Sequence, residues 1–351
     1  MNGHAFPAIA EGDGYTIVEN ASLEGRNSFH VAARAAMLVD VRKPVALGDL
    51  LGQAMLRTQP LLVLGEGSNI LFTRDWPGVV LSIAARGIGV LEDDGERVRV
   101  RVAAGENWND FVRWSLGNAL CGLENLVLIP GSVGAAPIQN IGAYGVEVRE
   151  FIATVEAWDR RAGRIVRIDN AGCAFGYRDS LFKRERDRYI VTAAEFDLPR
   201  RRGLRVDYPG VREELSALGV ATPTAPMVAE AIARIRTRKL PNPALVGNAG
   251  SFFKNPLLGA AAAAALCADH PAMPNWPAPG GRTKLSAAWL IESLGFKGVR
   301  DGDAAVSATH ALVLVNHGGA SGSAILALAE RIRAAVEARY GVVLEPEPLI
   351  V

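Results

Sequence analysis

A strand-like run, residues 61–64, leads directly into Gly65-Glu66-Gly67-Ser68-Asn69. A dinucleotide-binding Rossmann motif needs a third glycine that opens a helix. Here the chain continues with two further strand-like runs, 70–72 and 79–83, so this motif is not a Rossmann site. Two interpretations remain: a plain hairpin turn, or a nest of backbone N–H groups for a pyrophosphate, to which Ser68 and Asn69 add hydrogen bonds.

The chain has 351 residues, which is too long for one ordinary core and suits two or three domains. Residues 1–20 show no sustained period, and regular structure is expected from about residue 22. Lys239-Leu240-Pro241-Asn242-Pro243 stops a predicted helix, and the sequence therefore predicts a domain boundary there.

The charges nearly cancel: Lys and Arg number 38, Asp and Glu number 37, and the net charge is +1. No global field draws such a chain to nucleic acid or to a membrane surface. The alanine-rich uncharged run 255–268 is shorter than the roughly 20 residues that span a bilayer, and no secretory signal is recognisable. A cytoplasmic protein is expected. Its three cysteines lack metal-ligand spacing and are interpreted as reduced thiols, and no metal site is expected.

Several elements follow from hydrophobic periodicity. Residues 97–102 alternate as a strand, Asn107 caps a helix over 108–116, and residues 46–57 carry helical spacing. A helix over 225–238 is expected to turn its apolar residues to the core and its arginines outward. The residues assigned to the core are Met227, Val228, Ala231, Ile232 and Ile235, and those assigned to the surface are Arg234, Arg236 and Arg238.

Two loops have compositions typical of binding sites. Residues 130–145 contain four glycines and no charge, which suits a chain lying against a flat ligand, although a packed interdomain loop is the alternative. Residues 247–256 surround Ser251 with glycines, amides and a lysine. The plainer interpretation of this second loop is a turn into an alanine-rich helix, with Asn255 as its N-cap and Pro256 at its first position.

Charged residues in three other segments could take part in chemistry. Arg178 lies between aromatic residues, so it forms either an exposed ion pair with Asp179 or a buried site for an anion. Glu345 and Glu347 fall on one face of an extended C-terminal stretch, and spacing alone does not choose between them. His310 is interpreted first as a structural histidine and second as a ligand contact.

Taken together and in order, five motifs resemble the UDP-N-acetylenolpyruvoylglucosamine reductase family, in its type I branch. The resemblance runs from about Leu23 to Glu347 and rests on the segments 64–69, 130–145, 175–180, 247–256 and 344–347. Two positions depart from the family pattern: Leu349 stands where the family often has arginine, and Ser28 stands where threonine is more usual.

This resemblance implies an α+β fold: a two-subdomain FAD-binding module of the vanillyl-alcohol-oxidase/PCMH type plus a C-terminal α/β substrate-binding domain. The implied ranges are 1–85 and 86–238 for the two FAD-binding subdomains and 239–351 for the substrate domain. FAD is the implied cofactor, NADPH the co-substrate, and the enzyme a monomer. The implied FAD contacts are Gly65, Glu66, Gly67, Ser68, Asn69, Gly131, Ser132, Gly134, Gln139, Asn140 and Gly145.

The resemblance also implies reduction of the enolpyruvyl group of UDP-N-acetylglucosamine enolpyruvate during peptidoglycan precursor synthesis. Ser251 would give a proton to C2, Arg178 would hold the substrate carboxylate, and Glu347 would be the third catalytic residue. The implied substrate contacts are Tyr177, Tyr208, Lys239 and Asn255. Two other hypotheses compete with this one: a different FAD oxidoreductase of the same fold, and a nucleotide-sugar-binding protein without redox activity.

Overall fold

The computed structural model describes residues 9–351, which form two compact units. Unit 1 contains the chain up to Ala21, together with Ala35–Glu66 and Pro77–Arg236; unit 2 contains Ser22–Arg34, Gly67–Trp76 and Thr237–Val351. Two short segments from the N-terminal part of the chain therefore belong with the C-terminal unit. The three domain ranges given above remain predictions.

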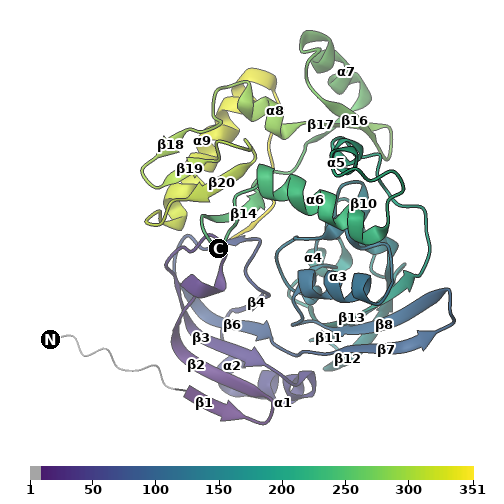
Figure 1. Cartoon of the computed structure of the whole chain (residues 1–351). Coiled ribbons are helices and arrows are strands. Elements are labelled where there is room, and N and C mark those ends of the chain that lie inside the picture. The colour runs from purple at the N-terminus through teal and green to yellow at the C-terminus, as the bar shows by residue number, and fades with distance from the viewer. Residues whose placement is uncertain (1–8) are drawn as a thin grey trace. The chain divides into compact units, whose positions relative to one another are not determined.

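The first sheet of unit 1 has the strand order β1-β2-β3-β6-β4 (Figure 1). Its strands are β1 (Ile9–Gly12), β2 (Tyr15–Ser22), β3 (Arg34–Val41), β6 (Trp76–Ile83) and β4 (Leu61–Leu64). β4 runs parallel to β6, and no helix follows the loop after β4, as predicted. The expected single helix over 46–57 is instead two short helices, α1 (Leu47–Gly52) and α2 (Ala54–Arg57), separated at Gln53.

The prediction that residues 1–20 lack regular structure is wrong for residues 9–20, and residues 1–8 lie outside the described part of the chain. β1 and β2 form an antiparallel hairpin in which Gly12 pairs with Tyr15. The two turn residues are Asp13 and Gly14, and Gly14 has a φ of 90°. Asp-Gly is a favoured pair for such a turn, so the turn residues indicated the hairpin better than the weak periodicity did.

The second sheet of unit 1 is antiparallel, with the order β12-β11-β13-β8-β7. Its strands are β12 (Arg164–Asp169), β11 (Ile152–Asp159), β13 (Tyr189–Pro199), β8 (Arg97–Ala103) and β7 (Ile88–Asp93). The prediction for 97–102 is confirmed, because Val98, Val100 and Val102 are buried. Helix α3 (Trp108–Gly117) contributes Trp108 and Phe111 to the same core, and the Phe111 ring lies 4.7 Å from that of Phe196.

The helix caps and buried helix faces of unit 1 agree only in part with those predicted from the sequence. The Asn107 side chain accepts the N–H of Asp110, so the predicted cap of α3 is confirmed. Helix α6 (Ala225–Lys239) buries Val228, Ala231, Ile232 and Ile235, but Met227 is 42% exposed and its core assignment is wrong. The remaining short elements of unit 1 are β9 (Gly142–Ala143), β10 (Val146–Glu147), α4 (Leu181–Arg184) and α5 (Val211–Ala217).

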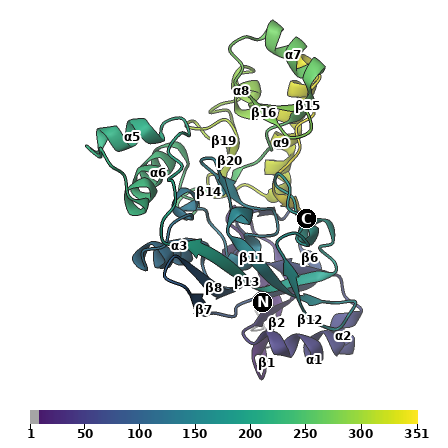
Figure 2. The same ribbon diagram turned by 90° about the vertical axis from the view of Figure 1, so that its right-hand side faces the viewer.

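Unit 2 is built on the antiparallel sheet β14-β20-β19-β18, against which α9 (Gly322–Tyr340) packs (Figures 1 and 2). Its strands are β14 (Gly247–Ser251), β20 (Val313–Asn316), β19 (Ala304–Val306) and β18 (Arg300–Asp301). A second, smaller sheet has the order β15-β17-β16, and β21 (Leu349–Ile350) pairs in parallel with β5 (Ile70–Leu71). The other elements are β15 (Leu257–Gly259), α7 (Ala260–Asp269), β16 (Asn275–Ala278), β17 (Arg282–Leu285) and α8 (Ala287–Glu292).

The assignment of Asn255 and Pro256 as the start of the alanine-rich helix is wrong. Strand β15 lies between them and α7, whose N-cap is Gly259. The Asn255 Oδ1 instead accepts the N–H of Ala287, the first residue of α8, at 3.0 Å. The local capping pattern was misleading because β15 is held by pairing with β17, which is distant in sequence.

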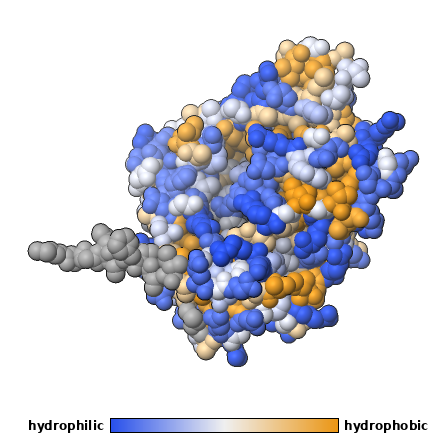
Figure 3. Space-filling view, turned by 60° about the horizontal axis from the view of Figure 1, so that its bottom comes forward, coloured by the Kyte–Doolittle hydropathy of each residue, from blue (hydrophilic) through white to orange (hydrophobic). Residues whose placement is uncertain are grey.

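Hydrophobic residues form small patches among hydrophilic ones on the face drawn in Figure 3. Within residues 9–351, no helix is both long and apolar enough to cross a bilayer. The three cysteines, Cys121, Cys173 and Cys267, are unpaired, as predicted.

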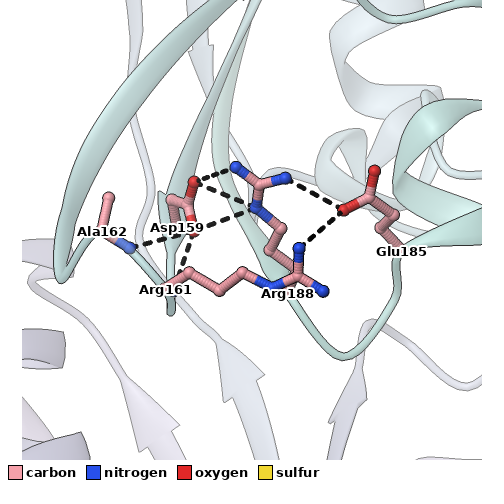
Figure 4. Close-up of polar contacts among 5 residues, drawn as sticks. All are labelled: Asp159, Arg161, Ala162, Glu185 and Arg188. Atoms are coloured by element: carbon pink, nitrogen blue, oxygen red, sulfur yellow. Dashed lines mark hydrogen bonds and ion pairs between the residues drawn. The ribbon is translucent and has the colours of Figure 1, made fainter.

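An ion-pair cluster joins the end of β11 to the start of β13 in unit 1 (Figure 4). The Asp159 carboxylate accepts three hydrogen bonds from Arg188 at 2.8–3.2 Å, and two more from the backbone N–H groups of Arg161 and Ala162. Arg188 also donates to Glu185 at 3.1 Å. The Arg188 guanidinium and the two backbone donors hold the pKa of Asp159 at about 2, below its ordinary value of 3.8.

This lowered pKa predicts a specific acid sensitivity. The ionised Asp159 contributes its full stabilisation above about pH 4, and the contribution disappears as the pH falls toward 2. Thermal unfolding of Asp159→Asn and of the wild type from pH 7 to pH 2 should show a stability difference that shrinks below pH 4. The exposed Asp187→Asn in the neighbouring loop is the control and should follow the wild type. An Asp159→Asn difference that is constant over the whole range would contradict this assignment.

Candidate functional site

In unit 1, the end of β4 meets the glycine-rich segment 131–134. A Cβ atom on Gly65 would lie 2.9 Å from the Ser132 Oγ, and one on Gly134 would lie 2.5 Å from the Ala104 Cβ. The N–H of Gly134 donates to the carbonyl of Ala104 at 2.9 Å, which fixes this approach. Only small residues fit here, so the end of β4 and the segment 131–134 lie directly against each other, an arrangement that we call the cradle.

Asn107 connects this cradle to helix α3. Its Nδ2 donates to both oxygens of the Glu66 carboxylate, at 3.0 and 3.2 Å, while its Oδ1 caps the helix. Residues 107 and 132 also form an isolated backbone bridge. The Glu66 side chain is therefore engaged by the protein, and a cofactor contact from Glu66 would come from its backbone.

The segment 139–145 is held to the Arg178 turn by Asn140. Asn140 is fully buried, and its Nδ2 donates to the carbonyl of Gly176 at 2.9 Å and to the Glu147 carboxylate at 3.1 Å. Its Oδ1 accepts the N–H of Arg149. Both amide hydrogens are thus used within the protein, so Asn140 acts first as a tie between two predicted site loops. Gln139 is half-buried and Gly145 is exposed, with a φ of 81°.

Arg178 lies at the tip of a tight turn. Gly176 and Asp179 exchange backbone hydrogen bonds, so only Tyr177 and Arg178 form the tip, and Arg178 has a φ of 53°. Non-glycine residues rarely adopt such a conformation, and they often do so at functional sites. The Arg178 Nη2 donates to the carbonyl of Gly142 at 2.9 Å, which holds the guanidinium beside the 139–145 segment. Asp179 forms an ion pair with Arg184.

Three side chains near this segment form a second cluster in unit 1. The rings of Tyr144 and Tyr208 lie 5.1 Å apart in an edge-on arrangement, and Tyr208 is 46% exposed at its turn. Arg236, which the sequence placed on the outer face of α6, instead points inward and donates to the carbonyl of Leu128 at 3.3 Å. Burial lowers the pKa of the Arg236 guanidinium and raises that of Tyr144. Arg236 lies four residues after the buried Ile232, at the edge of the apolar stripe, and this spacing was the only sign of its inward position.

In unit 2, Ser251 and Glu347 belong to neighbouring backbone segments. The N–H of Glu347 donates to the carbonyl of Phe252, the residue after Ser251, at 2.8 Å. Ser251 ends β14 opposite Val313, after an irregularity in which Gly250 has a φ of 69° and donates to the Asn248 side chain. The structure therefore brings together two of the three predicted catalytic positions within one unit, while Arg178 belongs to unit 1.

Asn69 connects the glycine loop to the same C-terminal stretch. Its Nδ2 donates to the carbonyl of Glu347 at 3.2 Å, and its own carbonyl accepts the N–H of Leu349 at 3.0 Å. Ser68 and Asn69 are half-buried. A predicted cofactor loop and a predicted catalytic residue are thus joined directly.

The two C-terminal glutamates lie in different environments. The Glu345 side chain is 71% exposed and forms an ion pair with Lys254 at 2.9 Å. Glu347 is half-buried, between the segments that contain Asn69 and Ser251. Geometry therefore favours Glu347, although their spacing in the sequence did not distinguish them.

The predicted substrate contacts of unit 2 lie at the end of α6 and near α8. Lys239 is exposed at the last position of α6, and its carbonyl accepts a hydrogen bond from Thr309 at 2.9 Å. Asn255 uses its Oδ1 at α8, so an anion would be bound by its amide NH₂ end. The His310 Nδ1 accepts the N–H of Leu312, and burial, followed by the charges of Lys239 and Lys297, lowers the pKa of His310. This hydrogen bond is consistent with the first interpretation of His310, as a structural histidine.

Two family models match the chain. Residues 35–169 match a FAD binding domain, and residues 242–351 match the UDP-N-acetylenolpyruvoylglucosamine reductase C-terminal domain. The first range contains all of the predicted FAD contacts, and the second contains Ser251, Asn255 and Glu347.

Individual relatives match almost the whole chain. UDP-N-acetylenolpyruvoylglucosamine reductase of Xanthomonas campestris pv. campestris (strain 8004) is 52% identical over 338 residues, covering 96% of this chain and 97% of the relative. The reductase of Xanthomonas oryzae pv. oryzae (strain PXO99A) is also 52% identical, over 339 residues. The crystal structure of UDP-N-acetylenolpyruvylglucosamine reductase (MurB) from Thermus caldophilus is 26% identical, with a TM-score of 0.65, and covers 98% of this chain and 99% of that one. An α+β fold that joins a FAD-binding module to the family's C-terminal domain, and this identity over almost its full length, show that the chain belongs to the UDP-N-acetylenolpyruvoylglucosamine reductase family.

Proposed function

We propose that this chain is the NADPH-dependent, FAD-containing reductase that converts UDP-N-acetylglucosamine enolpyruvate to UDP-N-acetylmuramate. The observation that carries the proposal is the juxtaposition of the Ser251 and Glu347 segments in unit 2, in a chain 52% identical to named reductases. The cradle at Gly65, Ser132 and Gly134 supports FAD as the cofactor. Bound FAD would accept hydride from NADPH and deliver it to C3 of the enolpyruvyl double bond.

Arg178 has the chemistry to bind the substrate carboxylate. A guanidinium pairs with a carboxylate through two parallel hydrogen bonds, and it stabilises the negative charge that builds beside C2 as C3 is reduced. The hydrogen bond from Arg178 to Gly142 sets the direction of the guanidinium before substrate arrives. Preorganisation of this kind lowers the cost of ordering the side chain during the reaction.

Ser251 is the proposed proton donor to C2. A serine hydroxyl is a weak acid, but the enolate-like carbon that forms is a strong base, so position matters more than a matched pKa. Pairing with Val313, after the irregularity in β14, positions the backbone that carries this hydroxyl. Glu347, on the neighbouring segment, would donate a hydrogen bond to the developing anion in its protonated form, since an ionised carboxylate only accepts hydrogen bonds.

The remaining predicted residues would bind the nucleotide. Lys239 and the amide of Asn255 would bind the diphosphate, and Tyr177 and Tyr208 would be further substrate contacts. Both tyrosines lie beside groups already placed: Tyr177 shares the turn of Arg178, and Tyr208 packs against Tyr144.

Anaerobic mixing distinguishes this function from its competitors. The purified chain, reconstituted with FAD, should be reduced by NADPH and then reoxidised by UDP-N-acetylglucosamine enolpyruvate, followed by flavin absorbance. Failure to bind FAD would exclude any flavoenzyme and favour a nucleotide-sugar-binding protein. Reduction without reoxidation by this substrate would indicate a FAD oxidoreductase that acts on another compound.

Replacing the proposed proton donor should separate the two half-reactions. Ser251→Ala should leave flavin reduction by NADPH within about twofold of wild type and slow reoxidation by substrate by about 10²–10⁴-fold, because the proton is needed only in the second step. Stopped-flow absorbance measures both rates. Ser293→Ala, in the same unit, should change neither. Equal losses in both half-reactions would show that Ser251 is structural.

The two glutamates provide a matched pair of variants. Glu347→Gln should slow reoxidation by substrate by about 10²-fold or more, because the amide cannot reproduce the acid's role at the developing charge. Glu345→Gln should stay within about twofold of wild type, because it loses only an exposed ion pair with Lys254. The reverse order of effects would assign the catalytic role to Glu345.

A further inference from the structure

The Ser28 hydroxyl is buried and has no hydrogen-bond partner within the described part of the chain. Most buried polar side-chain atoms are hydrogen-bonded, so an exception calls for a specific explanation. A serine hydroxyl can rotate to reach any nearby acceptor. None is available to Ser28 among residues 9–351, which makes a bound molecule a candidate partner for this hydroxyl.

Two hydrogen bonds hold the backbone of Ser28 in place. The N–H of Ser28 donates to the carbonyl of Gly67 at 3.0 Å, and its carbonyl accepts the N–H of Asn248 at 2.8 Å. The neighbouring Asn27 side chain is 3% exposed and bonds to the backbone of Leu23 and Val31. All of these residues belong to unit 2.

The backbone segment that contains Ser28 lies directly beside the glycine loop. A Cβ atom on Gly67 would lie 1.9 Å from the carbonyl oxygen of Arg26, so the loop backbone lies directly against residues 26–28. Gly67 has a φ of 67° and is followed by Ser68 and Asn69. Ser28 thus lies beside the part of the loop where we expect the pyrophosphate.

We propose that the Ser28 Oγ donates a hydrogen bond to a phosphate oxygen of FAD. This inference rests on one part of the proposed function, which is the binding of FAD at residues 65–69. A hydroxyl that donates to a charged phosphate oxygen forms a strong, charge-assisted hydrogen bond. The backbone N–H of Ser28 is already used by Gly67, so the contact can come only from the side chain.

Ser28→Ala, Ser28→Thr and the control Ser115→Ala test this contact in the full-length protein. The dissociation constant for FAD is measured from flavin fluorescence, and thermal unfolding is followed with and without FAD. Ser28→Ala should raise the dissociation constant about tenfold to hundredfold, the loss expected for a hydrogen bond to a charged group. Ser28→Thr keeps a hydroxyl and should restore affinity to within about threefold of wild type.

The sign of the stability change separates a ligand contact from a structural one. Without FAD, Ser28→Ala should unfold at the same temperature as wild type or higher, because it removes an unsatisfied buried hydroxyl. With FAD it should unfold at a lower temperature. Ser115, whose buried hydroxyl donates to the carbonyl of Val112, should show the opposite pattern: Ser115→Ala should lower stability in both states and leave FAD affinity unchanged.

An unchanged FAD affinity in Ser28→Ala would overturn the proposal while leaving the reductase assignment intact. A loss of stability that is equal with and without FAD would also overturn it, and would indicate that a buried water satisfies the hydroxyl. If wild-type protein does not bind FAD, both this inference and the proposed function fail.

Discussion

Backbone pairing of the C-terminal stretch is the interaction on which the site in unit 2 depends. The N–H of Glu347 bonds to Phe252, and that of Leu349 bonds to Asn69. The Asn69 side chain closes the arrangement by donating to the Glu347 carbonyl, across 278 positions of sequence. Such hydrogen bonds fix the relative positions of backbones to fractions of an ångström, which catalysis requires. Hydrogen bonds therefore connect the residues around Ser251, the end of the glycine loop and the C-terminal glutamate.

In unit 1, the candidate site residues are positioned by strained backbone conformations that tertiary hydrogen bonds hold in place. Asn140, Tyr144 and Arg178 all have positive φ angles, which cost free energy in residues other than glycine. The buried amide of Asn140 holds its own loop to the turn at Gly176, so tertiary hydrogen bonds compensate for the strained backbone. Strain of this kind is tolerated where it directs a functional side chain, and in the proposed site it would direct the guanidinium of Arg178.

Much of the fold was predictable where local chemistry and tertiary packing agree, as in the alternating valines of β8 and the Asn107 cap of α3. The order of the five motifs along the chain led to the prediction of which loops form the candidate site. The sequence failed where a distant partner decides the outcome. Asn255 accepts a hydrogen bond from the first residue of α8 instead of capping α7, and Arg236 turns inward to a backbone carbonyl. Glu345 and Glu347 have equivalent spacing, and only the pairing of the C-terminal stretch separates their environments.

The central claim is that Ser251 and Glu347 act as one unit because backbone pairing holds them together. A double-mutant cycle on reoxidation of the reduced enzyme by substrate tests this most directly. Residues that act together lose activity non-additively, so Ser251→Ala/Glu347→Gln should be about as slow as the slower single variant. Losses that multiply in the double variant would show that the two residues act independently, which would contradict this account.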